Sequence, residues 1–198
     1  MKRIVKTLLV ISLSFGTIFM ASSCKRSVKR INPNKQVDLS GRWNDVDARL
    51  VAEEMVKDVM ARPWHSNHFN KTGKKPVIIV GMVVNKTMDQ IEPEVFIKDL
   101  EREFINTGSV RVVTNSEFRE KIRQERADQQ EFASKETAKK WGKELGADYM
   151  MFGVINSVDD QYKKRKIAYY KVNLELADIE TNEIVWLGEK EIKKDIRN

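Results

Sequence analysis

The run of residues 77–85, VIIVGMVVN, constrains the fold of this chain more than any other segment. It follows Pro76, is almost continuously apolar and is rich in β-branched side chains. A strand that faces water on one side alternates apolar and polar residues, whereas a strand covered on both faces does not. We therefore expect a buried central strand in a sheet that carries helices on both faces.

Helical periodicity flanks this strand. Apolar residues recur every three or four positions over 48–60, where Asp45 is expected to cap the helix. Residues 64–75 are expected to form a loop. A second helix is expected over 93–106, ending at Gly108. Its apolar stripe comprises Phe96, Leu100, Phe104 and Ile105.

The remaining segments complete an α/β pattern. Further helices are expected at 117–130 and 135–145, a second central strand at 110–114, and later strands at 148–158, 167–179 and 183–194. Polar turns are expected at 159–165 and 180–182. Strand–helix–strand units favour parallel pairing, and short turns between strands favour antiparallel pairing. The predicted fold class is therefore α/β, with a mixed β-sheet and flanking helices.

The first 23 residues have the order of a bacterial secretory signal. The positive region contains Lys2, Arg3 and Lys6. The uncharged apolar stretch 8–20 follows, and it is shorter than the roughly 20 residues that a helix needs to span a bilayer. Small residues then precede Cys24, the only cysteine. We predict a signal peptide over 1–23 and lipidation of Cys24, although Ala21 stands where a lipobox usually has leucine. The alternatives are an ordinary cleaved signal that leaves a free thiol and an uncleaved anchor.

A short tether and one domain are expected after the signal. Residues 24–39 comprise the lipidated cysteine and a polar tether, which reaches about 50 Å when extended. Residues 40–198 have the size of a single globular domain. In lipoproteins of some Gram-negative bacteria, an acidic residue directly after the cysteine marks retention in the inner membrane. No acidic residue directly follows Cys24, so similarity to these lipoproteins implies the outer membrane, with the domain in the periplasm. Loss of the three cations of the signal lowers the net charge from +7 to +4, and this mild excess does not indicate nucleic-acid binding.

No catalytic constellation emerges from the sequence. His65 and His68 lie three apart, but a metal site needs further ligands. The sequence around Gly73 lacks the upstream glycine and the Ser/Thr of a P-loop. We therefore predict no enzyme activity, no catalytic residue, no metal, no cofactor and no small-molecule substrate.

Aromatic residues outside the periodic segments are the candidates for contact with another protein. Trp43 lies beside Arg42 in SGRWNDVD, and Trp64 lies in the expected loop. Tryptophan and arginine are enriched at binding hot spots. Partner binding is assigned to Arg42, Trp43, Asp47 and Trp64, with coverage of the core edge as the alternative for both tryptophans.

Several long strings resemble the penicillin-binding protein activator LpoB family. They are DLSGRWNDVDARLVAEEM (38–55), LEREFINTGSVRVV (100–113), RQERADQQEFASKETAKKWGKELGADYMMFG (123–153) and YYKVNLELADIETNEIVWLGEKEIKK (169–194). The resemblance implies an outer-membrane lipoprotein that binds a bifunctional class A penicillin-binding protein in the periplasm and stimulates its peptidoglycan synthesis. It also implies a fold similar to the N-terminal domain of TolB.

The tether departs from that family. Enterobacterial members have a long, proline-rich tether, whereas residues 25–39 contain only Pro33. This difference keeps open a second function, that of a non-catalytic accessory or assembly lipoprotein in an envelope transport or secretion complex.

Overall fold

The computed structural model describes residues 27–33, 35, 37–113, 143 and 145–197. The chain divides into two compact units, Met1–Lys35 and Gln36–Asn198. All described helices and strands lie in the second unit, which we call the globular unit, and it contains its own core. It can therefore fold without the residues before it. Over the described part of the chain, no helix is long and apolar enough to cross a membrane.

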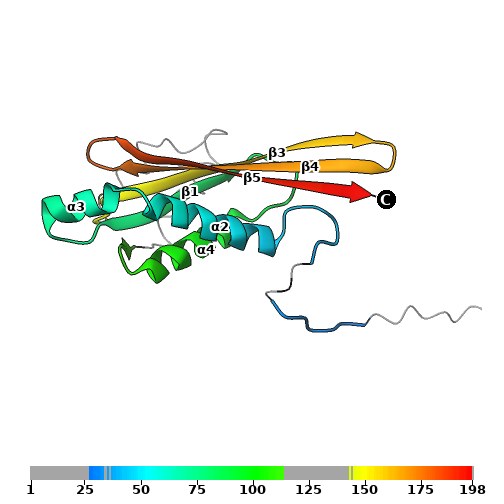
Figure 1. Ribbon diagram of the computed structural model, residues 1–198, viewed down its shortest axis with the longest axis horizontal. Coiled ribbons are helices and arrows are strands. Elements are labelled where there is room, and N and C mark those ends of the chain that lie inside the picture. The colour runs from blue at the N-terminus through cyan, green and yellow to red at the C-terminus, as the bar shows by residue number, and fades with distance from the viewer. Residues whose placement is uncertain (1–26, 34, 36, 114–142, 144, 198) are drawn as a thin grey trace, which may run out of the picture. The chain divides into compact units, whose positions relative to one another are not determined.

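A five-stranded mixed sheet forms the frame of the globular unit (Figure 1). Its strands are β1 (Val77–Asn85), β2 (Arg111–Val112), β3 (Tyr149–Tyr162), β4 (Arg165–Asp178) and β5 (Ile184–Arg197). Their order is β2-β1-β3-β4-β5. β1 pairs in parallel with β2 and β3, and β3, β4 and β5 pair antiparallel. The predicted α/β class and mixed sheet are confirmed.

Two strand predictions need correction. β2 is not a central strand, because Arg111 and Val112 pair with β1 alone and lie at the edge of the sheet. The turn expected at 159–165 is much shorter, since β3 and β4 continue until Tyr162 pairs with Arg165. Polar side chains suggested a turn there, but a hairpin that projects into solvent can be polar on both faces while its backbone hydrogen bonds remain complete.

Two helices pack on one face of the sheet. These are α2 (Asp45–Met60) and α4 (Pro93–Thr107), which lie side by side beneath the strands in Figure 1. Their core residues Val51, Phe96 and Leu100 are fully buried against that face. Ile79 and Met150, in a second apolar cluster, are also buried. The helices predicted at 117–130 and 135–145 lie almost wholly outside the described residues.

The helix boundaries correct two further predictions. Asn44, not Asp45, caps α2: its side chain accepts from the amides of Val46 and Asp47, and the Asp47 carboxylate accepts from the Asn44 amide at 3.0 Å. This reciprocal capping box satisfies helix donors that Asp45, inside the helix, cannot reach. The segment expected as a loop contains α3 (Trp64–Thr72), in which only Trp64 is buried, so no apolar period marked it.

We predict that Phe104→Ala lowers the free energy of unfolding by about 3–5 kcal/mol, because it empties a fully packed core position. The matched control is Ile105→Ala, the next residue of α4, which belonged to the predicted apolar stripe but is 59% exposed. Its effect should stay within about 0.5 kcal/mol. Denaturant unfolding followed by circular dichroism measures both, and equal losses would contradict this packing.

Candidate functional site

The predicted contact residues fall at two places in the globular unit. Arg42, Trp43 and Asp47 gather near Lys194 of β5, where the chain leads into the unit. We call Asp38, Arg42, Asp47 and Lys194 the Lys194 cluster. Trp64 lies instead beside a polar pocket at the opposite end of the sheet. Cys24 lies outside the described residues.

The ammonium group of Lys194 organises its cluster. It donates to Asp47 Oδ2 at 2.5 Å, to Asp38 Oδ1 at 2.9 Å and to the backbone oxygen of Arg42 at 3.0 Å. These bonds use all three donors that a lysine has. The Lys194 and Asp47 side chains are only 10% and 8% exposed, so each compensates the charge of the other away from water.

The adjacent residues Arg42 and Trp43 differ in what they offer to a partner. The Trp43 ring packs edge-on against Phe96 and Tyr170, with centroids 6.2 and 5.8 Å apart, and its amide donates to the Tyr170 hydroxyl. That hydroxyl in turn donates to Asp89, and burial together with this bond raises the pKa of Tyr170. Arg42 remains 67% exposed with Nε 3.7 Å from Asp89. Arg42 therefore presents its side chain outward, whereas Trp43 packs inward.

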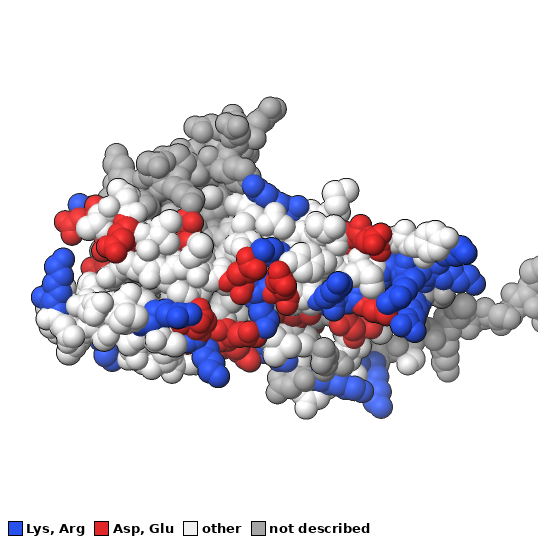
Figure 2. Space-filling model, turned by 45° about the horizontal axis from the view of Figure 1, so that its top comes forward, with Lys and Arg blue, Asp and Glu red and all other residues white. Residues whose placement is uncertain are grey.

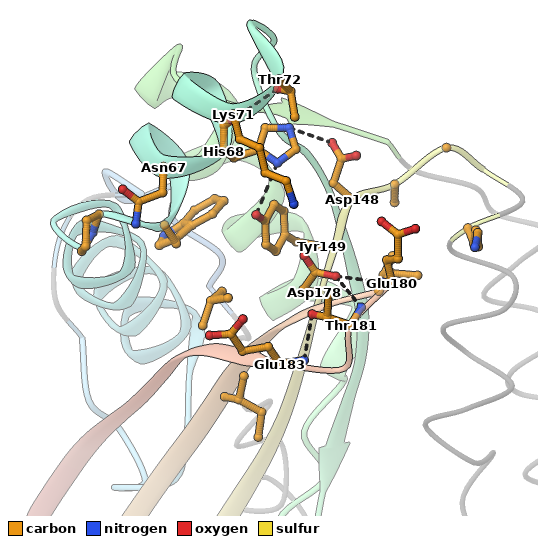
Figure 3. Close-up of a pocket in the computed structure, with 18 residues that line it drawn as sticks. Asn67, His68, Lys71, Thr72, Asp148, Tyr149, Asp178, Glu180, Thr181 and Glu183 are labelled. Atoms are coloured by element: carbon orange, nitrogen blue, oxygen red, sulfur yellow. Dashed lines mark hydrogen bonds and ion pairs between the residues drawn. The ribbon is translucent and has the colours of Figure 1, made fainter.

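The polar pocket has a volume of about 690 Å³ and opens where β3 begins and β4 ends (Figure 3). Carboxylates and cations share its lining, among them Asp148, Asp178, Glu180, Glu183, Lys71 and Lys143. Trp64 is 5% exposed there, donates from Nε1 to the Val59 backbone oxygen at 2.8 Å, and packs edge-on against Tyr149.

Tyr149 and His68 form the inner wall of this pocket. His68 Nδ1 lies 3.3 Å from the Tyr149 hydroxyl, and His68 Nε2 lies 3.6 Å from Asp148 Oδ2. Burial, reinforced by the charges of Asp178, Asp148 and Glu183, raises the pKa of Tyr149 to about 12. The phenol therefore stays protonated at neutral pH and acts as a hydrogen-bonding group rather than a nucleophile.

Two of the pocket carboxylates hold the backbone. Asp148 Oδ2 accepts from the Val77 amide at 2.7 Å, and Asp178 Oδ1 accepts from the amides of Glu180 and Thr181, both at 2.8 Å. These bonds fix the start of β1 and the β4–β5 turn. Across the residues that the structure describes, no three His, Cys, Asp or Glu side chains are placed to hold a metal ion.

The sequence analysis does not predict the buried position of Lys194, although the sequence of β5 contains a signal for it. Ile192, Lys194 and Ile196 occupy alternate positions of β5, so a lysine shares one strand face with two isoleucines. A cation at an inward position requires a buried partner. That partner, Asp47, was considered only as a group for binding another protein.

The fold is that of the C-terminal domain of a peptidoglycan-synthase activator. The LpoB C-terminal domain from Salmonella enterica has a TM-score of 0.51 and 16% identity, over 75% of this chain and 99% of that one. The Escherichia coli LpoB C-terminal domain has a TM-score of 0.49 and 15% identity, again over 75% of this chain and 99% of that one. Lipoprotein GNA1162 from Neisseria meningitidis has a TM-score of 0.44 and 15% identity, over 61% of this chain and 83% of that one.

The family follows from the sequence itself. The family described as peptidoglycan-synthase activator LpoB matches residues 47–192, and the chain belongs to it. That family consists of activators rather than catalysts. Among curated protein sequences, none matches the chain.

We predict that Lys194→Met lowers the free energy of unfolding by about 2–4 kcal/mol, because Asp47 would keep a buried charge without its cation. Lys193→Met is the matched control. Its side chain lies on the other face of β5 and is exposed, so its effect should stay within about 0.5 kcal/mol. Thermal and denaturant unfolding measure both, and similar values for the two variants would contradict the role given to Lys194.

The raised pKa of Tyr149 predicts a loss of stability at high pH. An ordinary tyrosine has a pKa of 10.0 and Tyr149 one of about 12, so the unfolded chain releases this proton first. The contribution of the protonated Tyr149 phenol to the free energy of unfolding is complete below pH 10 and is lost as pH rises toward 12. Tyr149→Phe should make the free energy of unfolding fall less steeply across that window. Tyr162→Phe, at an exposed site, should leave the slope unchanged.

Proposed function

We propose that this protein is a lipoprotein, anchored through Cys24 in the outer membrane, whose globular unit binds and activates a bifunctional class A penicillin-binding protein in the periplasm. The observation that carries the proposal is the match of the peptidoglycan-synthase activator family to residues 47–192. The fold shared with the Salmonella LpoB domain supports it.

The mechanism is activation by binding. A protein that binds the active conformation of a synthase more tightly than the resting one shifts the population toward activity. The activator then needs a rigid surface, and it needs no reacting groups. The Lys194 cluster provides such rigidity, because the three hydrogen bonds from Lys194 hold the Asp38 and Asp47 carboxylates and the backbone of the exposed Arg42.

Within this proposal Arg42 makes the direct contact with the synthase. Its side chain is exposed, with Nε 3.7 Å from Asp89, and the next residue, Trp43, is held by the hydrogen bond from its amide to the Tyr170 hydroxyl. Trp43 and Asp47 support this surface from inside. Trp64 supports the polar pocket at the other end in the same way.

The short tether adds a condition on the partner. Residues 24–39 reach about 50 Å at full extension. Because Arg42 lies where the chain enters the globular unit, the synthase must present its contact domain within about that distance of the outer membrane.

A reconstituted assay tests the proposal. The purified protein should bind a class A synthase from its own organism and increase its rates of glycan polymerisation and crosslinking. Arg42→Glu should weaken binding by about tenfold or more, as is usual for an arginine hot spot. Arg62→Glu is the matched control, because Arg62 is 55% exposed at the far end of α2.

Two results would count against the proposal. If the protein neither binds nor stimulates any class A synthase of its organism, the activator function is wrong, and an accessory role in an envelope complex replaces it. If Arg42→Glu and Arg62→Glu weaken binding equally, the contact face has been misplaced.

A further inference from the structure

We propose that the tip of the β3–β4 hairpin is a docking surface for anionic membrane lipid. We define the basic tip as Lys163, Lys164, Arg165, Lys166 and Arg197. This inference goes beyond activation of a synthase. Only the orientation of the globular unit at the membrane depends on the proposed anchor at Cys24.

The hairpin extends further than the core requires. Ile155 of β3 is fully buried, whereas the last five residues of the strand, 158–162, are all exposed. They pair with 165–169 of β4, which pair in turn with the end of β5. This three-stranded extension buries little apolar surface at its end, so stabilising the core does not explain its length.

Cations gather at the end of this extension. Figure 2 shows Lys and Arg side chains clustered at one end of the molecule, on the right in that view. Asp195 binds Arg165 at 2.9 Å and Arg197 at 3.0 Å, and Asp159 binds Lys166 at 2.7 Å. These carboxylates lie further back along the strands. The outermost positions, Lys163 and Lys164, form the turn itself and are exposed.

Exposed apolar groups accompany these cations. Tyr162 is 74% exposed, and Lys163 Nζ lies 5.2 Å from the centre of its ring. Val158, four pairs further back, is 64% exposed. Amphipathic aromatic side chains among lysines and arginines are suited to the boundary between water and lipid, where the ring contacts lipid and the cations meet phosphate.

The chain enters the globular unit at this same end. Asp38 binds Lys194, which pairs across the sheet with Ala168 near the tip. Gly41 has φ +68° and packs so closely on Ile196 that a Cβ would lie 2.3 Å from that side chain. A tether from Cys24 therefore leads to the end of the unit that carries the basic tip, and anchoring holds that end near the membrane.

Phosphate headgroups suit this surface. Each lysine or arginine close to an anionic membrane strengthens binding roughly fivefold, within a range of about 10 Å at moderate salt. Such a patch is weak alone but effective beside a lipid anchor, since stable attachment usually combines two signals. The expected ligands are the headgroups of phosphatidylglycerol or cardiolipin at the surface of the anchoring membrane.

Vesicle binding by the globular unit, residues 36–198, tests this inference. This unit has its own core and lacks Cys24, so neither the lipid anchor nor the synthase contributes. It should sediment with vesicles that contain phosphatidylglycerol and not with pure phosphatidylcholine vesicles, and added salt should release it.

A charge-matched pair of variants locates the binding surface. Lys163→Asn with Lys164→Glu should weaken vesicle binding at least about tenfold. Asparagine is chosen because Lys163 has φ 53°, a left-handed conformation that asparagine tolerates. Lys74→Glu with Arg111→Gln changes the charge equally at the opposite end of the sheet and should leave binding within about twofold of the parent.

Three outcomes would overturn the inference. The first is equal binding of the unit to anionic and neutral vesicles at low salt. The second is an equal loss of binding in both double variants, which would indicate net charge alone. The third is a tip variant that binds vesicles normally but no longer binds the synthase, which would assign the tip to a protein partner. Because the vesicle assay contains no synthase, its failure leaves the proposed activator function intact. Failure of the synthase assay likewise leaves the proposed membrane docking intact.

Discussion

The ammonium group of Lys194 determines where the chain enters the globular unit. It binds the first turn of α2 through Asp47 and the preceding segment through Asp38 and the Arg42 backbone. Asp47 also completes the capping box of α2, so one carboxylate both starts the helix and neutralises a cation of the last strand. The beginning and the end of the unit are thereby joined, and the ring of Trp43 is held over the core.

Lys194 can occupy this place only because β5 follows β4 over its whole length. The ladder runs from the pair of Ala177 with Ile184 to the pair of Arg165 with Arg197. This antiparallel register gives the molecule two different ends, with the polar pocket beside the β4–β5 turn and the basic tip beside the β3–β4 turn. In Figure 1, α3 lies at the first end and the C-terminus of β5 at the second.

The sequence predicted those elements whose burial leaves a periodic pattern. β1 is apolar as far as Val84, and α4 shows a clear stripe before Gly108. The predictions failed where stability comes from backbone hydrogen bonds rather than burial, as in α3 and in the hairpin extension beyond 158. They failed for the same reason at the start of α2, because a capping box depends on backbone geometry. Of the candidate contact residues, Arg42 proved exposed, whereas the packing of Trp43 and Trp64 depends on Tyr170 and Tyr149, more than 80 residues away.

Membrane docking and activation of a synthase make opposite demands on one short tether. Strand β3 has 14 residues and is about 45 Å long, so a unit docked at its tip reaches about that far from the membrane. Released from the surface, the same unit gains up to about 50 Å from the tether. Arg42 lies at the docked end, because it belongs to the Lys194 cluster, and a synthase that binds it must compete with lipid for that end or approach from the side. On the two proposals together, contact with the synthase draws the unit away from the membrane, and the strength of the basic tip sets how readily this happens.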